Sequence, residues 1–313
     1  MRLSAVDCLR RGLASLWANR ELVLIQWLQG FAFTLLLAIG FGLPFVVLGY
    51  DLSTTDVLAD PGRTLPDLLP RAQGRLPGLL AALLGTLVLW LLAGLLHCYV
   101  QAGTYGVLLA GDRQALPGAP RSTRLFRTFS WRNFFGWAGR YGARFFGFAN
   151  LIGLFFLGWG LLLLLWMAAT LAGAARWGES GAFGIGCGGA LPLAFLLLVL
   201  SLWYGVAQAD LAREGSGVRA ACRIGLEVLG ARLGAVVLVF VLFLCAFLAA
   251  LGLVALGADR LLPAQPALRA AAQIGFTLLE SLTQGLLLIA LGGTLVALVR
   301  SETSRGAGSP IPA

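Results

Sequence analysis

Six long apolar runs restrict this sequence to a membrane fold. They cover residues 22–49, 77–110, 145–173, 183–208, 233–257 and 270–299. Each run can cross about 30 Å of hydrocarbon at about 1.5 Å per residue. Lipid offers the backbone no hydrogen-bond partners and the runs lack the alternation of a β-barrel, so we predict that they are helices. The chain is 12% charged, about half the share usual in soluble domains, which also favours a bilayer as the solvent.

The predicted fold class is all-α, a polytopic transmembrane helical bundle of six spans. We expect a single membrane domain over residues 1–305 and a disordered C-terminal tail over residues 306–313. The first run is longer than the apolar core of a signal peptide and lacks a clear cleavage site, so we read it as a retained helix.

The arginines predict the orientation of the spans. All 23 basic residues are arginine and the formal net charge is +9. Most of them lie in the segment before the first run, in the connections after the second and fourth runs, or after the sixth. An acidic loop over residues 51–67 lies on the opposite side. The positive-inside rule therefore places both termini in the cytoplasm of a multi-pass cell-membrane protein.

Basic segments with apolar and aromatic side chains precede each pair of runs, at residues 3–17, 121–144 and 217–232. In the first, helical spacing puts the apolar side chains on one face and turns Asp7, Arg10 and Arg11 away from it. Such segments are typical of amphipathic helices in the headgroup plane, or they are connectors packed under the bundle. As interfacial helices they would contact anionic lipid headgroups through Arg124, Arg127, Arg132 and Arg140.

A polar signature in the second run of each pair divides the chain into three pseudo-repeats, residues 1–112, 113–214 and 215–305. In each run a polar residue stands four positions before a glutamine, which puts both side chains on one helix face. We predict that these faces meet in an intramembrane polar cluster. Its members are His97 and Gln101, Tyr204 and Gln208, and Glu280 and Gln284.

Glu280 and His97 are the two titratable members of this cluster. A carboxylate inside a span is costly unless it is paired or neutral. Glu280 is therefore either a proton- or substrate-interacting group or part of a hydrogen-bond clasp to Gln101, Gln208 or His97. His97, the only histidine in the chain, is either a proton relay with Glu280 or an interhelical hydrogen-bonding residue.

The sequence lacks the motifs that identify several common classes of enzyme, which argues against those classes. The sequence contains no P-loop, HExxH or GxSxG motif, and its Gly-rich stretch 181–189 lies within an apolar run and not in the strand–turn–helix unit of a Rossmann fingerprint. The five cysteines are far apart and form no CxxC pair, so neither a disulfide framework nor a zinc site is indicated. We predict no cofactor, no metal and no nucleic-acid partner. We read Gly184 and Gly188, at GxxxG spacing, as a close helix-packing site.

Four segments of the sequence resemble segments of known proteins. Three are the Arg/aromatic segments CLRRGLASLWANREL, RLFRTFSWRNFFGWAGR and VRAACRIGLEVLGARL, and the fourth is the polar span LWYGVAQADLAREG. The layout resembles bacterial six-span membrane proteins, among them the membrane domain attached to some glycerophosphodiester phosphodiesterases. The resemblance implies a bacterial cytoplasmic-membrane protein. It does not imply phosphodiesterase activity, because no segment here matches that soluble catalytic barrel.

Three functional hypotheses remain open. The first is a non-enzymatic scaffold or lipid-associated membrane module, with membrane lipids and an unidentified protein as partners. The second is a transporter for a small or lipidic solute, with the polar cluster lining a cavity. The third is an intramembrane enzyme that uses His97 and Glu280 as its acid/base pair. A cavity that reaches Glu280 would favour transport, and a dry bundle would favour the scaffold.

Overall fold

The computed structural model describes residues 3–49, 74–115, 123–261 and 266–306, and these ranges contain helices and no strand. The helices are α1 (Ala5–Ala18), α2 (Glu21–Val47), α5 (Leu76–Gln114), the short 3₁₀ helix η1 (Thr123–Phe126), α6 (Trp131–Leu211), α7 (Val218–Leu261) and α8 (Pro266–Gly306). The predicted all-α fold is therefore confirmed. The acidic loop at 51–67 and residues 307–313 of the predicted tail lie outside the described residues.

Six helical segments in the described ranges are long and apolar enough to cross a bilayer. They are Glu21–Val47, Leu76–Gln114, Trp131–Gly181, Phe183–Leu211, Val218–Val254 and Gly275–Thr303. Many of their large apolar side chains are exposed, such as Leu157 and Leu191. An apolar surface this extensive is unfavourable in water and requires a lipid environment. The chain is a multi-pass integral membrane protein, and the six predicted spans are confirmed.

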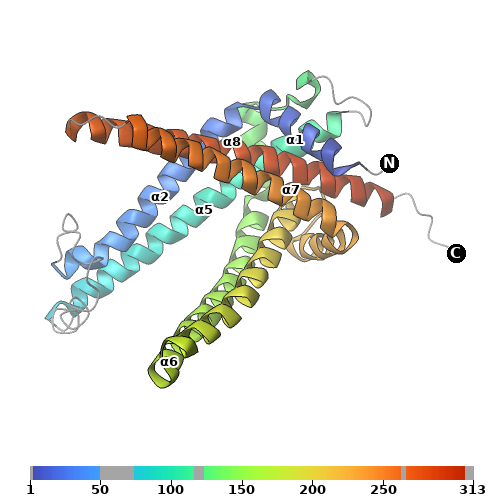
Figure 1. Ribbon diagram of the computed structural model, residues 1–313. Helices are drawn as coiled ribbons and strands as arrows, with labels where there is room; N and C mark the ends of the chain where they lie inside the picture. The colour runs from blue at the N-terminus through green and yellow to red at the C-terminus, as the bar shows by residue number, and fades with distance from the viewer. Residues whose placement is uncertain (1–2, 50–73, 116–122, 262–265, 307–313) are drawn as a thin grey trace.

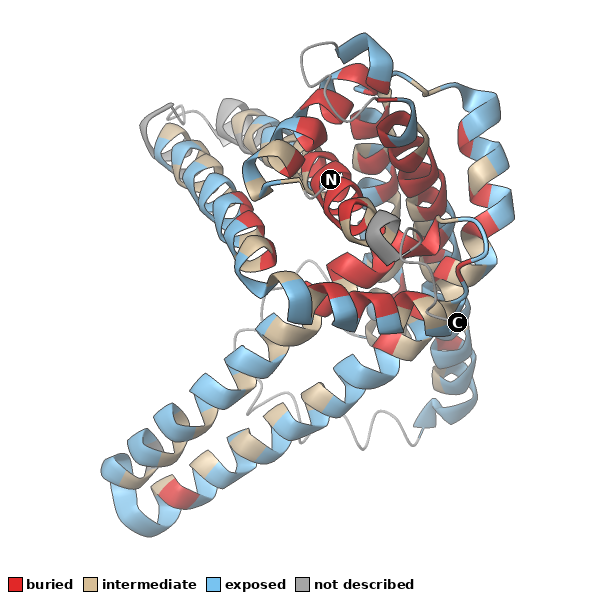
Figure 2. Ribbon diagram, turned by 90° about the vertical axis from the view of Figure 1, so that its right-hand side faces the viewer, coloured by how far each residue is buried: buried red, intermediate tan, exposed pale blue. Residues whose placement is uncertain are grey.

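The spans form three hairpins that spread from a common base. Helices α2 and α5 lie side by side, α6 folds back on itself, and α7 lies beside α8 (Figure 1). Buried residues concentrate where the hairpins converge, whereas the arms are largely exposed (Figure 2). We call this region the base: α1, η1 and segments 100–112, 202–212 and 289–301. The hairpins follow the chain order of the three proposed pseudo-repeats, whose relationship stays a prediction.

The basic segments before the hairpins differ from one another. Only the first forms a separate helix, α1. Residues 131–144 continue directly into the first arm of α6, and residues 218–231 join α7 at a break in helical geometry at Arg232 (φ −141°, ψ 30°). The Arg232 guanidinium donates to the Leu3 carbonyl (2.5 Å) and to Ser301 Oγ (3.0 Å). The break thus brings a buried cation under α1 and α8.

Helix α1 buries one of its charged side chains. The helix begins with a capping box, in which Ser4 hydrogen bonds hold the pKa of Asp7 below its usual value. Arg11 is buried, whereas Leu13 and Trp17 of the predicted apolar face are exposed. Arg11 is buried because its acidic partner lies on α5, a contact that helical periodicity cannot reveal.

The glycine-rich turn of α6 corrects one expectation. The helix reverses at Gly178, whose positive φ of 66° suits glycine. Neither Gly184 nor Gly188 has a neighbour within 4 Å of an added Cβ, so the close packing predicted for this pair is wrong. Close approach occurs at Gly189 instead, where a Cβ would lie 2.1 Å from the Trp166 ring. The Trp166 indole also donates to the Ile185 carbonyl (3.1 Å) across the hairpin.

Candidate intramembrane polar site

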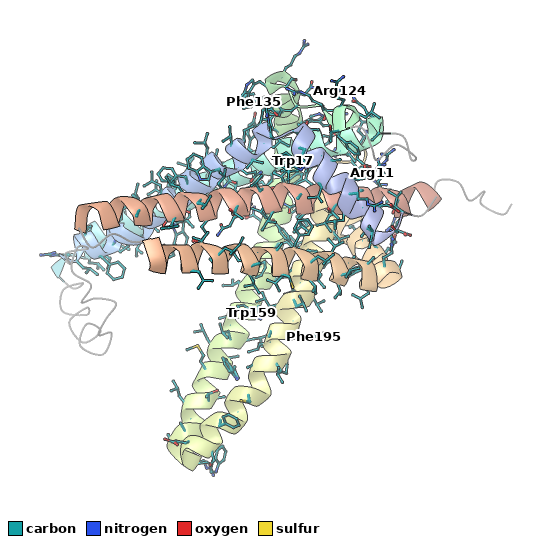
Figure 3. The ribbon with its side chains drawn as sticks, turned by 45° about the horizontal axis from the view of Figure 1, so that its top comes forward. Arg11, Trp17, Arg124, Phe135, Trp159 and Phe195 are labelled. Carbon is teal, nitrogen blue, oxygen red and sulfur yellow. The ribbon has the colours of Figure 1, made fainter. Side chains whose placement is uncertain are left out.

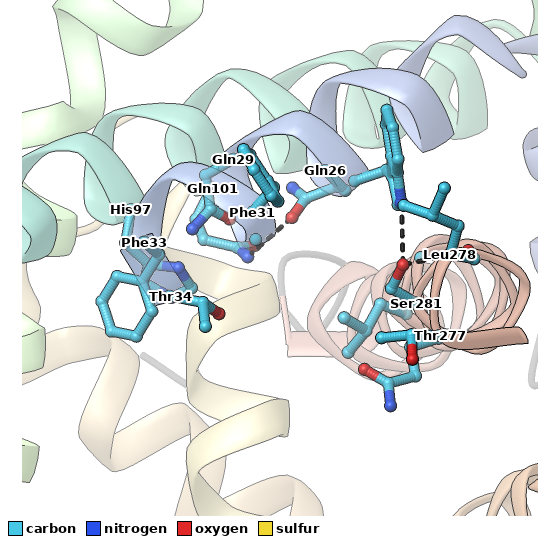
Figure 4. A pocket seen from close by; sticks show the side chains of 15 residues that line it. Gln26, Gln29, Phe31, Phe33, Thr34, His97, Gln101, Thr277, Leu278 and Ser281 are labelled. Carbon is cyan, nitrogen blue, oxygen red and sulfur yellow. Dashed lines mark hydrogen bonds between the residues drawn. The ribbon is translucent and has the colours of Figure 1, made fainter. Parts of the chain in front are cut away.

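A cavity of about 720 Å³ lies between α2, α5 and α8. Figure 4 shows the side chains from these helices that converge on it. Its outer edge carries exposed apolar side chains, among them Phe31, Leu278 and Leu288. Its polar lining residues are Gln26, Gln29, Thr34, His97, Gln101, Thr277, Ser281 and Gln284. The cavity therefore has an apolar mouth and a wall rich in amide and hydroxyl groups.

Hydrogen bonds organise the inner wall of this cavity. Gln101 Nε2 donates to Gln26 Oε1 (3.2 Å), and Gln26 Nε2 donates to Thr104 Oγ1 (2.8 Å). On the opposite wall, Trp27 Nε1 donates to Ser281 Oγ (2.8 Å). The Gln101–Gln26 and Trp27–Ser281 bonds are drawn in Figure 4. These bonds join α2 to α5 and to α8, so the wall is held by side chains from three spans.

A second, smaller cavity of about 160 Å³ shares Gln26, His97 and Gln101 with the first. It continues toward α6, where Tyr204 and Gln208 line it. The Tyr105 hydroxyl donates to Gln208 Oε1 (3.4 Å) at this end. The second and fourth spans therefore contribute polar side chains to adjoining cavities near the base.

Glu280 is placed apart from the rest of the predicted cluster. The structure brings His97, Gln101, Tyr204, Gln208 and Gln284 to the lining of the two cavities, but Glu280 lines neither. The half-buried Glu280 carboxylate accepts a hydrogen bond from Gln284 Nε2 (3.3 Å) on its own helix. Among the described residues it forms no hydrogen bond or ion pair with His97, so the pair required for the enzyme hypothesis is not assembled.

The face of α8 explains this placement. By helical spacing alone, Gln273, Thr277, Glu280 and Gln284 form one polar stripe on α8. The cavity is instead lined by the stripe Thr277, Ser281, Gln284, Gly285 and Leu288. Both patterns fit helical spacing, and the structure selects the second, which turns Glu280 to one side. The side chain of Gln273 is outside the described residues.

Gln26, Gln29 and Ser281 were missed by the sequence reasoning. Gln26 and Gln29 are three residues apart in the first span, and both are buried. This spacing places them on one helix face, which is a usable signal. The pseudo-repeat signature covers only the second span of each pair, so it does not include Gln26 and Gln29.

A cluster of ions, which we call the base ion cluster, joins α1, α5 and α8. Asp112 Oδ1 accepts from Arg11 Nε (2.7 Å), and Asp112 Oδ2 pairs with Arg300 Nη1 (2.8 Å). Arg11 also donates to the carbonyls of Asp112 and Ala115, and Arg300 donates to the Asp112 carbonyl. One buried carboxylate therefore serves two guanidinium groups.

Asn19 provides a second link at the base, between α1 and η1. Its side chain donates to the Phe126 carbonyl (2.8 Å) and accepts from the backbone N–H groups of Thr128 (3.0 Å) and Phe129 (2.9 Å). In the first half of α1, burial raises the pKa of the Cys8 thiol to about 11. Cys8 is thus a packing residue with little thiolate character at neutral pH.

The predicted headgroup arginines lie around the outside of the base. Arg124, Arg127, Arg132 and Arg140 are all exposed. Exposed Trp131 and Phe135 accompany them, with ring centroids 5.8 Å apart. Figure 3 shows Arg124, Phe135 and Trp17 on this part of the surface. Arg127 pairs with Glu21 (3.2 Å) and Arg140 with Glu214 (3.4 Å), but both pairs are largely exposed.

The described residues contain no group of three His, Cys, Asp or Glu side chains that could hold a metal ion.

Comparison with known proteins found no matching family model, no matching curated protein and no matching solved structure. The class is therefore defined by the fold and the site: a six-span membrane protein with an amide-rich cavity between its first, second and sixth spans.

Proposed function

We propose that this chain is a non-enzymatic, lipid-associated membrane module that binds an uncharged amphiphile in the α2–α5–α8 cavity. The observation that carries the proposal is the lining of that cavity. Amide and hydroxyl groups form its wall and exposed apolar side chains form its mouth. A ligand with a hydrogen-bonding headgroup and an apolar tail matches both parts. The volume of about 720 Å³ lies within the range of about 300–1,000 Å³ usual for ligand sites.

The charge of the lining supports an uncharged ligand. Among the described residues that line the cavity there is no aspartate, glutamate or arginine, and His97 is the one titratable side chain. A charged headgroup would lose its hydration there without gaining a counter-ion, which is unfavourable. Amides both donate and accept hydrogen bonds, so they suit hydroxyl, amide or ester groups on the ligand.

Unused hydrogen-bonding capacity supports the same conclusion. Within the described ranges, the side chains of Gln29, Thr34 and His97 form no hydrogen bond, although all three line the cavity. Polar groups without partners are costly inside a bilayer. A bound headgroup would supply those partners, and Gln29 is the best placed because it is buried.

Replacing Gln29 by leucine is expected to weaken ligand retention about tenfold, because losing one partner of a buried hydrogen bond costs about 1–3 kcal/mol. Gln29 forms no described hydrogen bond within the protein, so the fold is spared. The measurement is native mass spectrometry of protein purified from its own membranes, with lipid identification.

Thr170→Val is the matched control, because the Thr170 hydroxyl donates to the Trp166 carbonyl (2.9 Å) of its own helix and lines neither cavity. The proposal predicts one bound uncharged species in the wild type and in the control. Equal retention by Gln29→Leu, or bound lipid that matches the bulk membrane in all three proteins, contradicts it.

Transport of a small or lipidic solute is the second candidate function. The observation that favours it is that the two cavities adjoin: they share Gln26, His97 and Gln101, and the second is lined by Gln208 at its other end. Ligand flux across proteoliposomes that contain the purified chain would favour transport. Binding without flux would favour the module.

The proposal has two further parts: anionic lipids surround the base, and both termini lie in the cytoplasm. The exposed arginines and aromatic side chains at the base suit the headgroup region. Since most of the arginines lie in segments connected through the base, the positive-inside rule assigns that end to the cytoplasm. The resemblance to bacterial six-span membrane domains supports the cytoplasmic membrane as the location.

A further inference from the structure

A third cavity, of about 210 Å³, lies in the base where the second, fourth and sixth spans end. Three arginines from three separate parts of the chain line it. They are Arg113 at the end of α5, Arg213 just beyond α6, and Arg300 near the end of α8. Asp210 is the one acidic lining residue. We propose that this cavity is a binding site for a phosphate group.

The charge balance around the cavity is positive. Asp210 forms an ion pair with Arg213, whose Nε lies 2.9 Å from Asp210 Oδ1. It also accepts a hydrogen bond at Oδ2 from the Ser216 hydroxyl (2.5 Å). Asp112, which is not a lining residue, is shared between Arg11 and Arg300. Arg113 is exposed and forms no ion pair within the described part of the chain. The lining therefore holds three guanidinium groups and one carboxylate, and an anion would offset the excess.

The shape and chemistry select phosphate among anions. Guanidinium groups bind phosphate oxygens through paired, charge-assisted hydrogen bonds, and arginines on several sides match an anion with several equivalent oxygens. Two carbonyl groups at these helix ends already accept hydrogen bonds from arginine side chains. The Asp112 carbonyl accepts from Arg11 and Arg300, and the Arg213 carbonyl accepts from Arg144.

Replacing Arg113 by glutamine is expected to weaken phosphate binding about tenfold or more, since it removes one charged hydrogen-bond donor. Arg113 is exposed, so thermal unfolding should not change. Arg219→Gln is the matched control, because Arg219 is exposed at the same end of the molecule and lines none of these cavities. Both variants and the wild type are tested as full chains.

Two arms distinguish the source of the phosphate. Calorimetry in neutral detergent with inorganic phosphate tests a soluble ligand. Native mass spectrometry in a phosphate-free maltoside detergent, with and without added phosphatidylglycerol, tests a lipid headgroup. Binding in either arm that Arg113→Gln loses and Arg219→Gln keeps supports the site and names its source. No binding in both arms, or equal loss in the two variants, overturns it, whatever the outcome for the α2–α5–α8 cavity.

Discussion

Replacing Asp112 by leucine is expected to destabilise the folded protein by about 3–5 kcal/mol, the usual cost of removing one partner from a buried ion pair. Arg11 and Asp112 are each 4% exposed. The variant leaves the Arg11 guanidinium buried with backbone carbonyls and the Phe126 ring as its remaining contacts. Total stabilities of about 5–15 kcal/mol are typical, so the loss should show clearly as a lower thermal midpoint in mild detergent.

The double variant Arg11→Met/Asp112→Leu separates the charge effect from a general disturbance. Replacing a buried ion pair by apolar residues of similar volume is often neutral, and Arg300, which is 35% exposed, can turn toward solvent. The double variant should therefore recover most of the lost stability. Glu214→Gln, in an exposed ion pair with Arg140, should change stability by at most about 1 kcal/mol. A double variant as unstable as Asp112→Leu would contradict the assigned role of the base ion cluster.

Replacing Gly12 by alanine is expected to loosen α1 from α8. An added Cβ would lie 2.1 Å from Thr294 Oγ1 and 2.5 Å from the Ala290 carbonyl oxygen, so the helices must separate. Overpacking of this kind costs about 1–3 kcal/mol. The thermal midpoint should fall. Cys8, 0% exposed with a thiol pKa of about 11, should react faster with maleimide, as peptide mapping would detect.

Gly139→Ala is the matched control for this substitution. No atom lies within 4 Å of a Cβ at Gly139, and alanine is the better helix former by about 1 kcal/mol. The control should equal or exceed the wild type in stability and leave Cys8 protected. If the two alanine variants behave alike, the close approach of α1 to α8 does not exist in the folded protein.

The spans could be predicted from the sequence because lipid selects for composition over long windows. A run such as 233–257 needs no knowledge of its neighbours to be recognised as a span. The pairing of His97 with Gln101, and of Tyr204 with Gln208, was also accessible, since a spacing of four puts both side chains on one helix face. The adjoining cavities of the structure include all four residues.

The remaining features depend on contacts between distant segments. Arg11 is buried because Asp112, 101 residues away, neutralises it, and helical periodicity carries no such information. Glu280 and Ser281 are adjacent in sequence, so a small rotation of α8 decides which of them faces the cavity. Gly189 packs closely and Gly184 does not because the turn at Gly178 sets the register of the two arms.

Photocrosslinking from inside the α2–α5–α8 cavity tests the central claim most directly. A benzophenone-bearing phenylalanine would replace Phe33, which lines the cavity and contacts His97 with ring centroids 5.7 Å apart. Exposed Phe156 on α6 serves as the lipid-facing control. We predict that position 33 captures one class of uncharged amphiphile, whereas position 156 captures bulk phospholipid. The same bulk lipids at both positions would contradict the account.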